Sequence, residues 1–401
     1  MNKRRLWLLG ICVVFALAAA IQPGYALTGS QNSSDVVEAV VSDIADYQHD
    51  VSVMFTNVGY GDATLVQIDG NSYLIDTGSK ASVPQLLGAL AMCGVEKLEA
   101  VFLTHTHSDH IGGMEALASQ YAIGTLYSAE ISEDKKNGEN KIDLLAAELS
   151  LNHVKLMAGD TINLSADAFF DVLGPVVYNS EDDNDNSLVL RLGANGRSFL
   201  FTGDMQFAEE GTLLAAGVDL QADVLKVGNH GNPDATSQMF AAAVSPKIAV
   251  ISTSTVEDAD SANERVTSLF DGARVLVTEG FTRGALLRVS ASGEIKISSP
   301  QPPSPNADIE IVEIDKNAQT ITLINNGTEM DISGYMIFSQ RGSEVYVFPQ
   351  GTVMNAGQIL TIACTDGEGD LIWNDKKVWH AEKDDVGVLY DRYSSELSRF
   401  L

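Results

Sequence analysis

Apolar and polar positions alternate in short runs along most of this chain, and the pattern predicts a mixed α/β domain followed by an all-β domain. Residues 51–55 alternate, and two apolar runs at 63–68 and 72–75 are divided by a D-G-N turn, which is typical of a strand and a hairpin. Residues 83–93 instead have helical spacing, with Ser82 available as an N-cap. Strands and helices then alternate at 98–103, 114–120, 142–151, 169–173, 187–192, 198–202, 207–216, 223–227, 237–243, 247–252 and 263–270. Two sheets covered by helices satisfy this pattern.

A proline-rich stretch divides the chain into two domains. Residues 298–306 carry four of the ten prolines and predict a stiff, extended linker. The 401 residues are also more than one core usually holds. We therefore place the first domain at 50–297 and the second at 307–401, where alternating runs at 309–314 and 320–324 precede an N-N-G hairpin signal. Further short runs predict a β-sandwich.

The start of the sequence has the features of a secretory signal peptide. Three basic residues precede an apolar run at 6–21, and small residues at 23–26 offer a cleavage site after Ala26. The run has 16 residues, fewer than the roughly 20 that span a bilayer, so an uncleaved anchor is the lesser alternative. Residues 27–49 form a polar tether with a weak helical pattern over 36–44. We therefore expect a secreted or cell-surface protein.

The sequence is strongly acidic, with a formal net charge of −29, and cleavage would remove three basic residues and no acidic one, giving −32. A polyanion gains little from counterion release on DNA, and no basic stripe is visible in the sequence. Only Cys93 and Cys364 would remain, one in each domain, so no disulfide framework is expected. An interdomain bridge and two free buried thiols both stay open.

Three of the seven histidines lie within six residues, in the run H-T-H-S-D-H that begins at His105. The run follows the apolar stretch 98–103, a predicted buried strand whose end is a rigid support. His105 and His107, two apart, can point the same way, while Asp109 and His110 turn toward a second position. Neutral imidazole suits a borderline metal such as zinc, and carboxylate suits the same metal or a harder one. The run therefore predicts a divalent metal site rather than a polar loop that is histidine-rich by chance.

Asp204 is a second candidate ligand. It follows an apolar run at 199–201 and Gly203, so its carboxylate is expected at a strand end, as the histidines are. A Gly-Asp pair after a strand is also an ordinary turn, and the residues by themselves leave both interpretations open.

Five segments in order resemble one branch of the metallo-β-lactamase-fold hydrolases, beyond the H-x-H-x-D-H run itself. They read N-V-G-Y-G-D-A at 57–63, L-I-D-T-G at 74–78, N-D-N-S-L-V-L at 184–190, F-T-G-D at 201–204 and D-V-L-K-V-G-N-H-G at 223–231. The branch is the extracellular domain of the ComEC family of DNA-uptake proteins, with its free-standing relatives. The resemblance covers about residues 50–297 and implies an αββα sandwich.

The resemblance also implies the site. One or two divalent ions, Zn²⁺ first and Mn²⁺ as the alternative, would be held by His105, His107, Asp109, His110, Asp204 and His230. In this set Asp204 bridges, and Asp109 and His230 also serve as catalytic residues. Asp62 and Asp76 each end a strand beside glycine, where a carboxylate can orient a ligand histidine. Lys80 and Lys226 are the nearest basic residues, each either a contact for a substrate phosphate or simply solvated.

The chain departs from the family pattern at two places. Asn184 or Asn186 stands where most of the superfamily has a histidine, which favours a harder ion or lower affinity. Asn229 stands where the branch usually has the first histidine of H-H-G, and no histidine occurs near 260–264. If Asn229 occupies the ligand position, the second metal loses a ligand, whereas His230 in that position leaves the site intact.

The second domain resembles the lamin-tail domain, an immunoglobulin-like sandwich, from residue 307 to about 390, with Trp373 and Trp379 in its apolar C-terminal half. It contains no cluster of metal-ligating or acid–base residues. The resemblance therefore implies attachment to the cell surface or to another protein rather than chemistry.

The function implied is metal-assisted hydrolysis, in which bound ions activate water. The resemblance favours a phosphodiester, as in a nuclease acting on extracellular DNA, whereas the net charge favours a smaller phosphoester such as a choline-phosphate cell-wall group. A β-lactam or lactone ranks lower. The alternative that is not an enzyme is a surface binding protein with a residual metal.

Overall fold

The computed structural model describes residues 36–39, 51–131 and 140–401. The predicted signal peptide and nearly all of the polar tether lie outside these residues. Within them, no helix is both long enough and apolar enough to cross a lipid bilayer.

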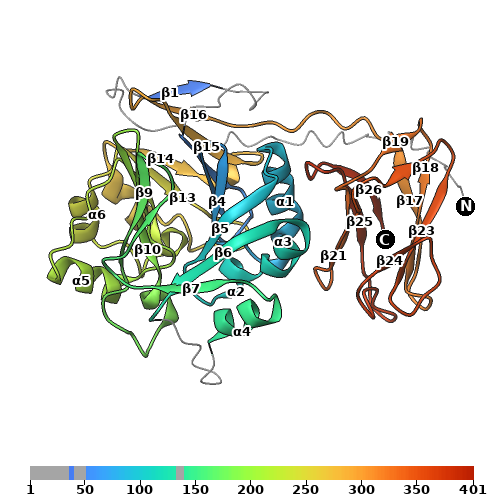
Figure 1. Cartoon of the computed structure of the whole chain (residues 1–401), viewed down its shortest axis with the longest axis horizontal. Helices are drawn as coiled ribbons and strands as arrows, with labels where there is room; N and C mark the ends of the chain where they lie inside the picture. The colour runs from blue at the N-terminus through green and yellow to red at the C-terminus, as the bar shows by residue number, and fades with distance from the viewer. Residues whose placement is uncertain (1–35, 40–50, 132–139) are drawn as a thin grey trace, which may run out of the picture.

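Two mixed sheets form the centre of the first domain and lie face to face, as Figure 1 shows. The nine-stranded sheet has the order β1 (Val36–Ala39), β16 (Ile295–Ser298), β15 (Gly284–Val289), β2 (Val51–Thr56), β3 (Thr64–Ile68), β4 (Asn71–Ile75), β5 (Lys97–Leu103), β6 (Ala122–Ala129) and β7 (His153–Leu156). The seven-stranded sheet has the order β14 (Arg274–Val277), β13 (Ile248–Ile251), β12 (Val224–Lys226), β11 (Arg197–Phe201), β10 (Val189–Ala194), β9 (Ala168–Gly174) and β8 (Thr161–Asn163).

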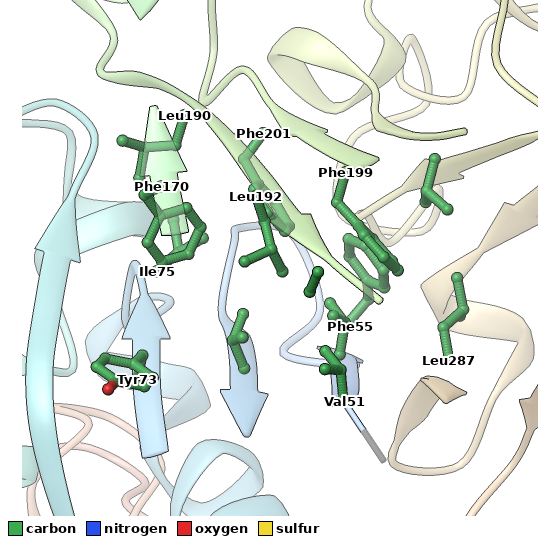
Figure 2. Close-up of a cluster of buried hydrophobic side chains, with 14 of the residues drawn as sticks. Val51, Phe55, Tyr73, Ile75, Phe170, Leu190, Leu192, Phe199, Phe201 and Leu287 are labelled. Atoms are coloured by element: carbon green, nitrogen blue, oxygen red, sulfur yellow. The ribbon is translucent and has the colours of Figure 1, made fainter. Parts of the chain in front are cut away.

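Successive residues of a strand point to opposite faces, so each central strand sends alternate side chains between the sheets and to an outer face. In β2, Phe55 points between the sheets and Met54 points to the outer face. In β11, Phe199 and Phe201 point inward, whereas Leu200 points outward. Figure 2 shows these inward rings meeting between the two sheets, with the Phe55 and Phe201 ring centroids 6.1 Å apart.

Helices cover both outer faces, which confirms the predicted αββα sandwich (Figure 1). The helices on the nine-stranded side are α1 (Val83–Met92), α2 (Ser108–Ile111), α3 (Met114–Gln120) and α4 (Lys141–Glu148). Those on the other side are α5 (Phe207–Ala215), α6 (Gln238–Val244) and α7 (Glu264–Thr267). Short 3₁₀ turns occur at η1 (Lys80–Ser82), η2 (Asp183–Asn186), η3 (Gly228–Gly231), η4 (Ser268–Phe270) and η5 (Thr278–Gly280).

The expected helical pattern at 36–44 is wrong where the structure describes it. Residues 36–39 form strand β1, which pairs in parallel with β16. An open sheet edge leaves backbone N–H and C=O groups without partners, and β-branched valines favour the extended chain that can pair with them. This pairing outweighs a weak helical periodicity.

The C-terminal domain is the predicted all-β sandwich with its own buried core. One sheet contains β17 (Ile309–Asp315), β18 (Thr320–Asn325), β23 (Ile359–Cys364) and β24 (Leu371–Trp373), and the other contains β21 (Val345–Val347), β20 (Met336–Ser339), β25 (Gly387–Tyr390) and β26 (Glu396–Phe400). A small pair, β19 (Met330–Asp331) and β22 (Val353–Met354), completes it. Trp373 and Trp379 are buried in an edge-to-face contact. Cys93 and Cys364 are both buried and free, so no interdomain disulfide forms.

The two domains are in contact through helix α1. Met336 of β20 is fully buried and belongs to the same apolar cluster as Leu87 of that helix. A methyl group built on Gly88 would lie 2.8 Å from the carbonyl carbon of Tyr393, so the helix and the C-terminal domain approach each other at backbone distance. Figure 1 shows β21 of the C-terminal domain beside the helical layer of the first domain.

This close approach predicts that Gly88→Ala has opposite effects on the stability of the whole chain and of a chain that ends at Ser299. Gly88→Ala should destabilise the whole chain by roughly 1–3 kcal/mol, because the added methyl group overpacks the contact with Tyr393. In a chain ending at Ser299, which we expect to fold because the first domain has its own clusters, the same change should stabilise α1 by roughly 0.5–1 kcal/mol. Urea unfolding of the four proteins measures both effects. Changes of the same sign in both chains would contradict the docking, and aggregation of the shortened chain would contradict the domain boundary.

Candidate metal centre

The histidines and aspartates that the sequence singled out meet at one edge of the sandwich, where strands of both sheets end. Asp76 follows β4, and His105, His107 and His110 follow β5, which runs parallel to β4. Asp204 follows β11, and His230 follows β12, which runs parallel to β11. Because the carboxyl ends of parallel neighbours lie at the same edge of a sheet, segments distant in sequence deliver their side chains to one place.

Asp204 lies at the centre of this group. Its Oδ2 atom is 3.1 Å from His110 Nε2, 3.2 Å from His230 Nε2 and 3.9 Å from His105 Nε2. Asp109 Oδ2 lies 3.2 Å from His230 Nε2, and the Asp109 side chain is partly exposed, at 20%, as that of His107 also is. Two sets include Asp204 and have donor atoms within 4.8 Å of one another: Asp109, His110, Asp204 and His230 in one, and His105, His107 and Asp204 in the other. A third set at the same distance consists of Asp62, Asp76 and His110.

Hydrogen bonds behind the centre fix the orientation of two of its histidines. Asp76 is 2.8 Å from His110 Nδ1 and also accepts hydrogen bonds from the amide and hydroxyl of Thr104. The carbonyl of Ser252 is 2.8 Å from His230 Nδ1. A ring whose Nδ1–H is held in this way presents Nε2 as a free electron pair. Asp76 therefore lies where its carboxylate can hold the orientation of the His110 ring.

The backbone of η3 directs the side chains of Asn229 and His230 to different places. Both residues have left-handed φ angles, 44° for Asn229 and 52° for His230, a conformation that asparagine and histidine tolerate better than most residues. The His230 ring turns into the centre, whereas Asn229 Nδ2 donates to Asp234 Oδ1 at 2.9 Å. The arrangement corresponds to the case in which His230 occupies the ligand position.

Lys226 lies behind the centre and is 3% exposed. Its ammonium group pairs with Asp62 and donates to the carbonyl of Gly203 at 2.8 Å. Burial lowers its pKa, but the carboxylates of Asp62 and Asp204 outweigh burial and raise it. This placement favours a structural role over the substrate contact that the sequence left open. Lys80, in contrast, is more than half exposed and lies 3.8 Å from Glu344 of the C-terminal domain.

The buried carboxylates and imidazoles of the centre shift one another's pKa values. Burial lowers the pKa of His230, but the carboxylates of Asp204 and Asp109 outweigh burial and raise that pKa to about 10. Burial also lowers the pKa of His110, but the carboxylates of Asp204 and Asp76 outweigh burial and raise that pKa well above its ordinary value. Burial would raise the pKa of Asp204, yet His110 and His230 hold it well below the usual range. The buried carboxylates thus require positive charge nearby, either as protons on imidazole or as a cation.

A divalent cation fits this requirement. His105 Nε2, His110 Nε2 and His230 Nε2 are buried and have no hydrogen-bond partner among the described residues, although all three point toward Asp204. A buried polar atom without a partner costs free energy, whereas a metal ligand does not. Imidazole nitrogens with carboxylate oxygens form the donor set of zinc and similar ions. The residues present therefore fit a divalent metal.

The turn η2 supports the loop that carries His105 and His107. The two asparagines of η2, Asn184 and Asn186, differ in their contacts. Asp183 accepts hydrogen bonds from the amide and hydroxyl of Thr106. Asn186 bonds to the backbone of Asn179 through both its oxygen and its nitrogen, so that side chain is already used. The Oδ1 atom of Asn184 is buried without a partner in the described structure and is therefore the better candidate for a metal or substrate contact.

Two residues near the centre were not singled out from the sequence. Asp183 is one, and its place in the acidic run before β10 gave no signal of the contact with Thr106. Tyr60 is the other, with its ring centroid 4.3 Å from that of His230. Burial, together with the carboxylates of Asp204 and Asp109, raises the pKa of Tyr60 above its usual value. An aromatic residue between two glycines in a segment shared with a metal-dependent family was the signal that could have found it.

Comparison with known families agrees with both resemblances. The profile described as "Metallo-beta-lactamase superfamily" matches residues 56–255, and the profile described as "Lamin Tail Domain" matches residues 302–400.

Individual relatives cover only part of the chain. ComE operon protein 3 of Bacillus subtilis (strain 168) is 30% identical over 216 residues, which are 49% of this chain and 27% of that protein. Competence protein ComA of Neisseria gonorrhoeae is 30% identical over 209 residues, 51% of this chain and 27% of that protein. The chain thus spans about a quarter of the length of these curated relatives. Among solved structures, the metallo-beta-lactamase fold protein YhfI from Bacillus subtilis has 13% identity and a TM-score of 0.40, covering 60% of this chain and 99% of that one.

Proposed function

The chain carries a domain of the metallo-beta-lactamase superfamily followed by a lamin tail domain, and we propose that it is a secreted, metal-dependent phosphodiesterase that acts on small phosphoesters in preference to DNA. The observation that carries this proposal is the set of Asp109, His110, Asp204 and His230, in which buried imidazole nitrogens converge on shared carboxylates. The curated relatives include competence protein ComA of Neisseria gonorrhoeae, and this relationship favours a phosphodiester as the substrate.

Each side chain of the centre has a distinct part in the proposed reaction. A divalent ion, Zn²⁺ or Mn²⁺, would be held by the two sets of residues and would supply Lewis-acid chemistry and acidify water. Asp76 and the Ser252 carbonyl keep the rings of His110 and His230 turned inward. Asp109 is the carboxylate that solvent reaches, so its Oδ2 atom is positioned to accept a proton from water that attacks the ester.

The charges around the centre support a small substrate. Glu257 lies against Gly59, where an added methyl group would be 2.6 Å from its carboxylate. Asp258 accepts a hydrogen bond from Asn232, and Asp234 accepts one from Asn229. None of these three acidic residues forms an ion pair with a described residue. A polynucleotide would bring many phosphates past this acidic rim, whereas a small ester brings one or two.

The same charges predict how salt changes the two reactions. Hydrolysis of single- or double-stranded DNA should become several-fold faster when salt is raised from about 20 to 150 mM, because salt screens the electrostatic repulsion between the acidic protein and the DNA. Hydrolysis of bis(p-nitrophenyl) phosphate should hardly change over this range. Initial rates of both reactions, measured with the same zinc- or manganese-loaded protein, test this expectation.

Three outcomes of that experiment count against the proposal. DNA hydrolysis that slows with salt would indicate a basic groove, as in an ordinary nuclease. Faster cleavage of DNA than of small esters at every salt concentration would overturn the preference for small substrates. Metal-loaded protein that cleaves neither substrate would favour the surface binding protein, in which the C-terminal domain supplies attachment and the centre holds a residual metal.

A further inference from the structure

We propose that Tyr60 is a substrate-contacting residue of the metal centre, whose hydroxyl group donates a hydrogen bond to a phosphoryl oxygen. The inference rests on the proposed phosphoester function and goes beyond it, because it names the side chain that would distinguish this chain's substrate site.

The loop around Tyr60 is fixed against the centre. Gly61 has φ 136°, and a methyl group there would lie 2.5 Å from the backbone oxygen of Asp109, so the loop and the metal loop are in contact. The amide of Asp62 donates to that same oxygen at 3.1 Å. Gly59, on the other side, has φ 73° and lies against Glu257. Only glycine fits these two positions without strain, and between them the backbone of Tyr60 has little freedom.

The ring of Tyr60 covers the outer side of His230. The two ring centroids are 4.3 Å apart with an interplanar angle of 44°. His230 itself is fully buried, whereas Tyr60 is partly exposed, so the tyrosine separates the candidate ligand from solvent. Asp109, the partly exposed carboxylate, lies 3.2 Å from Nε2 of the same imidazole, so a substrate at Asp109 lies next to the ring that Tyr60 covers.

The hydroxyl group is free to donate. The side chain of Asn232 lowers the pKa of Tyr60, as a donor to the phenol oxygen does, and its amide nitrogen also donates to Asp258 Oδ2 at 3.1 Å. An amide nitrogen can only donate, so Tyr60 accepts from it and keeps its own proton for another partner. With an ordinary pKa of about 10, a phenol is protonated at neutral pH. A donor held above carboxylates and imidazoles suits a phosphoryl oxygen, which carries negative charge.

The test compares Tyr60→Phe and Tyr60→Gln with the wild-type full chain. Tyr60→Phe removes only the hydroxyl group, so the affinity of the metal-loaded protein for inorganic phosphate should fall about tenfold to a hundredfold, as expected for a lost hydrogen bond to a charged group. The KM for bis(p-nitrophenyl) phosphate should rise by a similar factor, with metal content unchanged. Tyr60→Gln, whose amide is also a donor, should recover part of the loss. Calorimetric titration, steady-state kinetics and metal analysis measure these quantities.

Tyr127→Phe is the matched control, because that tyrosine stacks on Phe102 inside the sandwich, away from the centre. It should leave phosphate affinity unchanged. Wild-type phosphate affinity in Tyr60→Phe would overturn the proposal, as would a parallel loss of metal, which would make Tyr60 a support of the ligand cage. Wild-type protein that binds no phosphate would also overturn it. If the wild type binds phosphate through Tyr60 but hydrolyses no ester, this inference stands and the proposed activity falls.

Discussion

Asp204→Ala is expected to reduce hydrolysis of bis(p-nitrophenyl) phosphate by at least about three orders of magnitude. The reason is that Asp204 belongs to both sets of candidate ligands, with one oxygen 3.1 Å from His110 Nε2 and 3.2 Å from His230 Nε2. Its removal leaves buried imidazoles without the charge that they share. His107→Ala should have an effect of the same kind but confined to the set that contains His105.

Activity should be measured together with metal content. A chelator should inactivate the wild type, and added zinc or manganese should restore the wild type but not Asp204→Ala. Asp223→Ala is a matched control, because this aspartate lies at the other end of strands β11 and β12 and pairs with Arg197 and Lys247 instead. It should alter stability and leave metal content unchanged. Full activity of Asp204→Ala with one or two bound ions would show that the ligands lie elsewhere.

The second large effect is expected at His230. His230→Ala should weaken metal binding by at least about a hundredfold, because it removes an inward nitrogen from a fully buried position and leaves Asp109 and Asp204 facing each other without it. Asn229→His should change metal affinity little, since the side chain at 229 is directed toward Asp234 and not toward the centre. Competition with a chromophoric chelator measures both affinities.

Asn229→Ala serves as the control for disturbance of the left-handed turn that both residues share. If this variant loses metal as severely as His230→Ala, the effect belongs to the backbone of η3 rather than to the imidazole. An increase in metal content in Asn229→His, combined with normal binding in His230→Ala, would reverse the assignment and make Asn229 the position of a lost ligand.

Parts of this protein follow from the sequence because the relevant signals are local. The strands β2 and β11 were predicted from their apolar runs, and the period of two then requires Phe55 and Phe201 to point to the opposite faces from Met54 and Leu200. The run after β5 predicted a metal site because three histidines and an aspartate at a strand end need no distant partner to be recognised. The proline-rich stretch likewise marked the change from α/β to all-β structure.

Other features were decided only by tertiary structure, because they depend on contacts between residues far apart in the chain. The choice between Asn229 and His230 rests on two left-handed backbone angles and on the position of Asp234, none of which is visible in a periodicity. Lys226 resembles a substrate residue in the sequence but is buried against Asp62, which comes from the opposite sheet.

The contacts of Tyr60 and Gly88 are of the same kind. Tyr60 and His230 are 170 positions apart, and only the packing of two loops brings their rings together. Gly88 lies on a helix that the sequence predicts well, yet its contact with Tyr393 depends on how a second domain docks. Sequence patterns report which face of an element is buried, whereas charge compensation and docking depend on what covers that face, which only the complete fold determines.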